Sequence, residues 1–125
     1  MKRVLVIEDD RFNRLLYRDL LEGEGWAVIV APNATDGLRA AQESPPDVIL
    51  MDIQLPDMSG LDLTRTLKAD ANTAHVPVLI VSAHALEKHR AAARAAGADT
   101  FIKKPFEFAM LVQTVHRFLT EGGQA

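Results

Sequence analysis

The sequence has 125 residues, of which 48% are hydrophobic and 25% are charged, the composition of an ordinary globular domain. A second domain of usual size would not fit in this length, and intrinsic disorder is not expected. The 17 acidic residues outnumber the 14 Lys and Arg, which argues against a basic face for nucleic acid. No apolar run approaches the roughly 20 residues of a membrane helix, and no cysteine is present for disulfide or thiolate chemistry. We therefore expect one cytoplasmic domain, residues 1–125.

The first half of the chain alternates short apolar runs with amphipathic segments. It predicts a strand at residues 4–7, a helix around 15–21, a strand at 27–31 and a helix from Thr35 to just before Pro45. The first strand is a continuous, β-branched run, as in a strand buried on both faces. Threonine is a favourable helix N-cap, and the proline ring cannot continue a helix.

The second half continues the same alternation. It predicts a strand at residues 48–51, a helix at 61–68, a strand at 78–81, a helix at 86–96, a strand at 100–103 and a helix at 106–119. Gly97 is well placed to end the helix before it. Strands that alternate with helices in this way indicate an α/β fold with a parallel sheet.

Reactive side chains follow four of the five predicted strands. Residues 8–10 (Glu-Asp-Asp) follow the first strand, Asp52 the third, Ser82 the fourth, and residues 103–104 (Lys-Lys) end the fifth. Ligands of open parallel sheets bind beyond the carboxyl ends of the strands, where these ends gather. We therefore expect all of these side chains at one edge of the sheet.

Each of these side chains alone has a structural explanation. Asp9 or Asp10 could cap a helix, Asp52 a loop and Ser82 the next helix, and the lysines could be solvated charges. Their coincidence favours chemistry, because two carboxylates about 4 Å apart repel by roughly 4 kcal/mol at an effective dielectric near 20. A bound Mg²⁺ would reverse that repulsion, and an ammonium suits phosphoryl oxygens. The set predicts a phosphoryl-transfer site with Asp52 as nucleophile.

Four motifs in order along the chain resemble the receiver domains of two-component response regulators. They are Val4-Leu5-Val6-Ile7-Glu8-Asp9-Asp10, Ile49-Leu50-Met51-Asp52-Ile53-Gln54-Leu55-Pro56 with Gly60, Val81-Ser82-Ala83, and Lys104-Pro105-Phe106. The resemblance covers essentially the whole chain and is strongest to the single-domain members, which have no effector domain. It implies a flavodoxin-like (CheY-like), doubly wound, five-stranded parallel sheet, (βα)5 in three layers.

The resemblance implies a phosphoacceptor and a metal site. Asp52 would accept a phosphoryl group from a phosphohistidine on a partner protein. Mg²⁺ would be held by Asp9, Asp52 and the backbone carbonyl of Gln54, with Glu8 acting through water. Asp10 would fall just outside the site.

The resemblance also implies the residues that bind the phosphoryl group and respond to it. Ser82 and Lys104 would contact the phosphoryl oxygens, and adjacency to Pro105 selects Lys104 over Lys103. The Lys104-Pro105 peptide bond would be cis, which an X-Pro bond adopts at modest cost. Ser82 would move toward the phosphoryl group while Phe101 turns inward, a shift between two conformations. Phe101, where the family often has tyrosine, could also be an ordinary core aromatic.

Further positions are expected to tune the site and bind partners. Gln54 and His84 match places that influence the lifetime of the acyl phosphate. Residues 86–94 and 101–110 would form an output face for a downstream target. Docking of a sensor histidine kinase or histidine phosphotransfer protein would use five residues: Arg11, Phe12, Asn13, Leu15 and Phe106.

The expected function is that of a signalling protein, which catalyses at most its own phosphotransfer and dephosphorylation. Both a monomer and a phosphorylation-dependent dimer fit the sequence. The strongest alternative is a phosphohydrolase of the haloacid dehalogenase type, which also forms an aspartyl phosphate. That type needs an acid two residues after its nucleophile, where this chain has Gln54. A flavodoxin-like electron carrier is disfavoured, because the acidic loop after the first strand would repel a flavin phosphate.

Overall fold

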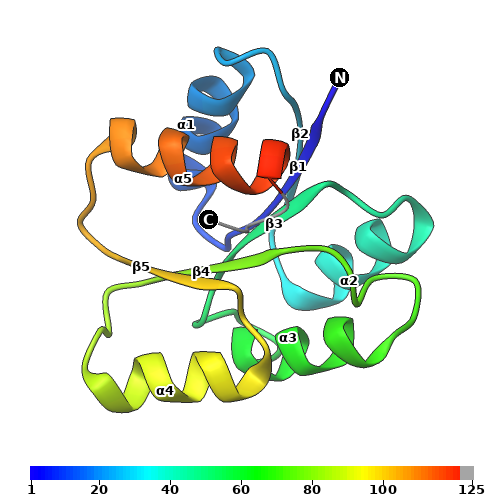
Figure 1. Ribbon diagram of the computed structural model, residues 1–125, viewed down its shortest axis with the longest axis vertical. Helices are drawn as coiled ribbons and strands as arrows, with labels where there is room; N and C mark the ends of the chain where they lie inside the picture. The colour runs from blue at the N-terminus through cyan, green and yellow to red at the C-terminus, as the bar shows by residue number, and fades with distance from the viewer. Residues whose placement is uncertain (122–125) are drawn as a thin grey trace.

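The computed structural model describes residues 1–121, in which strands and helices alternate (Figure 1). The elements are β1 (Arg3–Ile7), α1 (Arg11–Glu22), β2 (Ala27–Ala31), α2 (Ala34–Glu43), β3 (Val48–Asp52), α3 (Gly60–Ala69), β4 (Val78–Ser82), α4 (Glu87–Ala96), β5 (Thr100–Lys103) and α5 (Phe108–Glu121). In this part of the chain, no helix is long and apolar enough to cross a membrane. The predicted alternation of strands and helices is confirmed.

The five strands form one parallel sheet in the order β2-β1-β3-β4-β5. The chain leaves β1 for β2 on one side and reaches β3 on the other, so the order of the strands reverses between β1 and β3. Such a switch point opens a crevice beyond the carboxyl ends of the two strands. The register places Ile7 beside Met51, so the residues that follow, Glu8 and Asp52, come to this crevice together.

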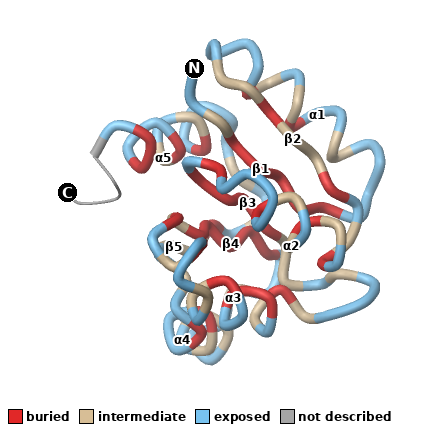
Figure 2. Tube along the Cα trace, turned by 90° about the vertical axis from the view of Figure 1, so that its right-hand side faces the viewer, coloured by how far each residue is buried: buried red, intermediate tan, exposed pale blue. Residues whose placement is uncertain are grey.

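Helices cover both faces of the sheet, which gives the three layers expected (Figures 1 and 2). Alternate strand residues point to opposite faces, so Val4 and Val6 pack with α1 and α5, whereas Leu5 and Ile7 pack with α2, α3 and α4. Nearly all side chains of the central strands are buried, as Figure 2 shows. The two apolar layers hold the strand ends in fixed positions.

Two helix starts differ from the sequence-based expectation. Asn33, not Thr35, caps α2 by accepting a hydrogen bond from the backbone N–H of Asp36, at 2.7 Å. The Thr35 hydroxyl instead donates to the carboxylate of Asp57, at 2.6 Å. The last helix begins at Phe108 rather than at residue 106, because Phe106 packs over α1 in the preceding loop.

Candidate functional site

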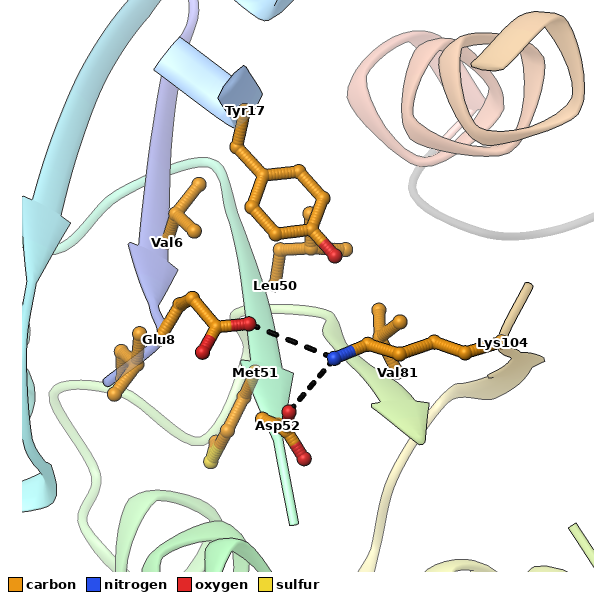
Figure 3. Close-up of a pocket in the computed structure, with 9 residues that line it drawn as sticks. Val6, Glu8, Tyr17, Leu50, Met51, Asp52, Val81 and Lys104 are labelled. Carbon is orange, nitrogen blue, oxygen red and sulfur yellow. Dashed lines mark hydrogen bonds and ion pairs between the residues drawn. The ribbon is translucent and has the colours of Figure 1, made fainter. Parts of the chain in front are cut away.

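Three segments far apart in the sequence bring an acid pair and a lysine together (Figure 3). Glu8 follows β1 and is only 3% exposed, and Asp52 is the last residue of β3. The ammonium of Lys104, which follows β5, lies 2.8 Å from Oδ2 of Asp52 and 3.5 Å from Oε1 of Glu8. Lys103, in contrast, is exposed on β5. The structure therefore gathers the acids and the lysine that the sequence places at the strand ends.

Burial and mutual charge set the protonation of this cluster. Burial raises the pKa of the Glu8 carboxyl, although the Asp10 backbone N–H and Lys104 favour its charged form. Burial alone would lower the pKa of Lys104, but the hydrogen bond and charge of Asp52, with the charge of Glu8, raise it above its ordinary value. Lys104 therefore stays an ammonium over the physiological range and acts as the counter-charge of both acids.

The loop after β1 holds its acids through its own backbone. Oε2 of Glu8 accepts a hydrogen bond from the backbone N–H of Asp10, at 3.0 Å. The Arg14 guanidinium donates to the carbonyl oxygens of Glu8 and Asp9, at 2.9 and 2.8 Å. Asp10 caps α1 by accepting from the N–H of Phe12, while Asp9 is exposed beside the cluster. Asp10 thus serves the helix, and Asp9 is free to face a ligand from solvent.

The loop after β3 curls tightly behind Asp52. The backbone N–H of Gln54 donates to Oδ1 of Asp52, at 3.1 Å, so the backbone of Gln54 lies next to the carboxylate. The N–H of Gly60 donates to the carbonyl of Ile53, at 2.7 Å. A Cβ at Gly60 would lie only 2.3 Å from the carbonyl oxygen of Asp52, so the approach requires glycine.

The same loop is tied to the start of α2. Both carboxylate oxygens of Asp57 accept hydrogen bonds there, from the backbone N–H groups of Ala34 and Thr35 and from the Thr35 hydroxyl. The hydrogen bond from the Thr35 hydroxyl, followed by those from the two backbone N–H groups, lowers the pKa of Asp57 to about 2. Asp57 therefore anchors the loop and does not belong to the acid cluster.

Ser82 and Phe101 lie on the neighbouring strands but are engaged elsewhere. Oγ of Ser82, a buried hydroxyl, accepts a hydrogen bond from the backbone N–H of His84, at 3.0 Å. The half-buried ring of Phe101 lies under the guanidinium of Arg90, with 4.9 Å from Cζ to the ring centroid. In residues 1–121, no hydrogen bond joins Ser82 to Asp52.

The side chains of Gln54 and His84, which follow β3 and β4, contact each other. Nε2 of Gln54 lies 3.1 Å from Nε2 of His84, so the two side chains expected to tune the acyl phosphate touch each other. His84 also lies near His89, with ring centroids 5.6 Å apart. The two side chains line one pocket together with Ile53, Leu61 and His89.

The donor set fits a hydrated Mg²⁺. In the described residues, no group of three or more His, Asp or Glu is arranged to enclose a metal. Mg²⁺ does not need such a cage, because it keeps several waters and binds proteins through one or two carboxylates. The Lys104 ammonium between Glu8 and Asp52 shows that this position accepts a cation. The two carboxylate oxygens that contact it, from Glu8 and Asp52, are the ligand type of a hard cation.

The predicted docking residues fall into two groups. Phe12 and Leu15 project from α1 with 82% and 49% of their surface exposed, and Arg11 beside them is exposed as well. Asn13 and Phe106 instead line a groove of about 440 Å³ that reaches to Lys104.

The groove also contains residues that the sequence reasoning missed. Leu16 and Phe108 line it together with Asn13, Phe106 and Tyr17. Tyr17 additionally lines a small pocket with Glu8, Asp52 and Lys104. The spacing of Asn13, Tyr17 and Leu21 along one helix face could have indicated that Tyr17 points inward beside the acids.

Comparisons with known proteins agree with this geometry. Residues 4–116 match the family model of the response regulator receiver domain. The polar-differentiation response regulator DivK of Brucella anthropi is 39% identical over 118 residues, which cover 94% of this chain and 96% of that protein. DivK of Brucella ovis is 38% identical over the same shares.

Solved structures show the same similarity. Chemotaxis protein CheY4 of Vibrio cholerae superposes with a TM-score of 0.89 at 26% identity, covering 94% of this chain and 98% of that one. The receiver domain of the sensor histidine kinase PA1611 of Pseudomonas aeruginosa, solved with a magnesium ion in its active site cleft, gives 0.87 at 30% identity, covering 94% and 97%.

Proposed function

Because the chain belongs to the response regulator receiver domain family, we propose that Asp52 accepts a phosphoryl group from a phosphohistidine in a Mg²⁺-dependent reaction. The observation that carries this proposal is the position of the Asp52 carboxylate. It lies at the strand switch point, with 16% of its side chain exposed and one oxygen on the Lys104 ammonium at 2.8 Å. The exposed part of this carboxylate gives a phosphoryl donor access from one side.

The proposed reaction is an in-line transfer between two nucleophiles. A carboxylate oxygen of Asp52 forms a bond to phosphorus as the phosphorus–nitrogen bond of the donor breaks, and the leaving imidazole takes a proton. Lys104 turns from the carboxylate to the phosphoryl oxygens, where its charge offsets the negative charge that arrives. Bound Mg²⁺ would supply a second positive charge on these oxygens.

Four groups would hold the metal ion. Asp9 and Asp52 would coordinate it directly, with the backbone carbonyl of Gln54 as a third protein ligand. Glu8, whose carboxylate is held by the Asp10 backbone N–H, would act through water. This division suits the burial of the two acids, since Asp9 is exposed to the incoming hydrated ion and Glu8 is enclosed.

The response to phosphorylation would begin at Ser82 and Phe101. The phosphoryl oxygens would draw the Ser82 hydroxyl away from its hydrogen bond with the His84 backbone. Phe101 would then leave its stacking with Arg90 and turn inward, which changes the surface of α4 and β5. Such a shift requires only that the phosphoryl group contact one conformation better than the other.

The partner that donates the phosphoryl group would dock on α1. The exposed apolar side chains of Phe12 and Leu15 lie beside the groove that leads to Lys104. Exposed aromatic and aliphatic anchors next to a reactive group suit the helix of a sensor kinase or phosphotransfer protein. The output face, residues 86–94 and 101–110, would bind the downstream target.

Intact mass spectrometry after incubation with acetyl phosphate and Mg²⁺ tests this function. We expect one added phosphoryl group on the wild type, none without Mg²⁺, and none on Asp52→Asn. Asp62→Asn is the matched control, because Asp62 is an exposed acid on α3 that pairs with Arg65 on the surface. Labelling of Asp52→Asn would overturn the assignment, and steady turnover of a small phosphate ester would indicate a hydrolase instead.

A further inference from the structure

The carboxylate of Asp57 joins the loop after β3 to the first turn of α2. Its Oδ1 accepts a hydrogen bond from the backbone N–H of Ala34 at 2.8 Å. Its Oδ2 accepts from the Thr35 N–H at 2.9 Å and from the Thr35 hydroxyl at 2.6 Å. The first N–H groups of a helix have no partner within the helix, so a carboxylate at this place satisfies them and meets the positive end of the helix dipole. One exposed side chain therefore connects two distant segments through three hydrogen bonds.

The start of α2 is a firm support for these hydrogen bonds. Ala34 is fully buried, and the helix lies directly on β1, where a Cβ added at Gly37 would come within 2.5 Å of Cδ1 of Ile7. Ile7 is the strand residue that directly precedes Glu8. Asp57 is therefore bound to a helix that packs on the strand leading to the acid cluster.

The loop that carries Asp57 also carries Gln54. The N–H of Gln54 donates to the Asp52 carboxylate, and Gln54 pairs with Ser59 in an antiparallel bridge that closes the base of the loop. Residues 55–58 lie between the two paired residues and form the tip of the loop, and Asp57 attaches this tip to α2. The base and the tip are thus held by different parts of the molecule, so the path of the backbone at Gln54 depends on both.

Resting on the proposed function, in which the backbone carbonyl of Gln54 is a ligand of Mg²⁺, we infer that Asp57 is a positioning residue that holds this carbonyl in place for the metal ion. A backbone carbonyl cannot turn independently of its planar peptide group, so the hydrogen bonds that hold the loop set its direction. Groups that orient a metal ligand contribute to metal affinity without touching the metal. Asp57 acts in this way, because its carboxylate binds α2 and not the acid cluster.

The coupling between the metal site and α2 works in both directions. Since the hydrogen bonds from α2 to Asp57 favour Mg²⁺ binding, bound Mg²⁺ favours these hydrogen bonds by the same factor. The N–H groups of Ala34 and Thr35 have the Asp57 carboxylate as their acceptor. The rate at which these two amides exchange with solvent measures how often the contact opens. The start of α2 therefore senses the occupancy of a metal site that lies on other loops.

Amide hydrogen exchange of the wild type, measured by NMR with and without Mg²⁺, tests this coupling and depends on the folding of no variant. We expect saturating Mg²⁺ to slow the exchange of the Ala34 and Thr35 amides about fivefold to tenfold. Asn72 is the matched control, because its N–H also donates to a carboxylate, that of Asp70 at 2.9 Å, but beyond the other end of α3. Exchange of Ala34 and Thr35 that stays the same while Mg²⁺ saturates the site overturns the inference.

Titration calorimetry of three variants separates the position of the loop from its charge. Asp57→Ala should weaken Mg²⁺ binding about fivefold to tenfold, and Thr35→Val, which removes one of the three hydrogen bonds and no charge, about threefold. Asp36→Asn is the control for charge, since Asp36 lies in the same turn of α2 and hydrogen-bonds to Asn33. A loss in Asp57→Ala that Asp36→Asn reproduces, with unchanged affinity in Thr35→Val, overturns the inference. Absence of Mg²⁺ binding by the wild type defeats the proposed function itself, so the two failures are distinguishable.

Discussion

Gly60→Ala perturbs the site through the backbone of the phosphoacceptor. The added Cβ would lie 2.3 Å from the carbonyl oxygen of Asp52 and 2.9 Å from Cα of Ile53, whereas Cβ atoms essentially never approach other heavy atoms closer than 3.0 Å. Reaching that limit requires the Asp52 carbonyl and the start of α3 to separate by at least 0.7 Å, the difference between 3.0 and 2.3 Å. Both contacts are to backbone, so no side chain can rotate away to relieve them.

The cost follows from the size of that displacement. Overpacking of this kind destabilises a protein by about 1–3 kcal/mol. For a chain of this length, 1 kcal/mol corresponds to roughly 3–6 °C in the unfolding midpoint, so we expect a decrease of about 3–18 °C. The displaced Asp52 carboxylate should also accept a phosphoryl group more slowly, because a reacting group that is misplaced by about 1 Å can react up to a hundredfold more slowly.

Gly23→Ala is the matched control for this substitution. Gly23 ends α1 with φ of −60°, and its added Cβ would meet no atom closer than 3.3 Å. We expect a change within about 0.5 kcal/mol for this variant. Calorimetric unfolding and the rate of labelling by acetyl phosphate measure both effects. A Gly60→Ala protein that unfolds and reacts like Gly23→Ala would refute the reasoning.

Lys104, Asp57 and Phe12 each provide a separate prediction. Lys104→Met removes the cation beside Asp52, so titration calorimetry should show Mg²⁺ bound at least about fivefold more tightly, roughly 1 kcal/mol; unchanged affinity would contradict this. The pKa of Asp57 is lowered from 3.8 to about 2, so its contribution to stability is complete above about pH 4 and is lost as the pH falls through 2. Urea unfolding should therefore give the wild type a higher free energy of unfolding than Asp57→Asn at about pH 5, and the two values should converge near pH 2. A difference in this free energy that does not change with pH would be inconsistent with the linkage. Phe12→Ala should slow transfer from a histidine phosphotransfer protein about tenfold and leave labelling by acetyl phosphate unchanged; equal effects on both donors would exclude a docking role.

The strands, and the edge of the sheet at which the site lies, could be predicted because the sequence patterns that indicate them are local. A continuous β-branched run such as residues 4–7 has few alternatives to a buried strand, and a parallel sheet brings the strand ends to one edge. The sequence alone therefore predicts that Glu8, Asp52 and Ser82 lie at that edge. Adjacency to Pro105 identified Lys104, and the structure turns its ammonium toward the two acids.

The remaining features depend on contacts between distant residues. Thr35 is a good N-cap by type, but Asp57, 22 residues away, takes its hydroxyl, and Asn33 caps the helix instead. Helical periodicity placed Tyr17 within α1 but could not show that its hydroxyl meets the end of the sheet. In both cases a contact with a residue that is distant in the sequence decides what the side chain does.

The central claim is that the carboxylate of Asp52 is the phosphoacceptor, and locating the modified residue tests it most directly. Borohydride reduces an aspartyl phosphate to homoserine, which tandem mass spectrometry of the peptides can place in the sequence. After treatment with acetyl phosphate and Mg²⁺, we predict homoserine at position 52 and not at positions 9, 10 or 57. Homoserine at one of those other positions, or at none in a protein that has gained a phosphoryl group, would contradict the claim.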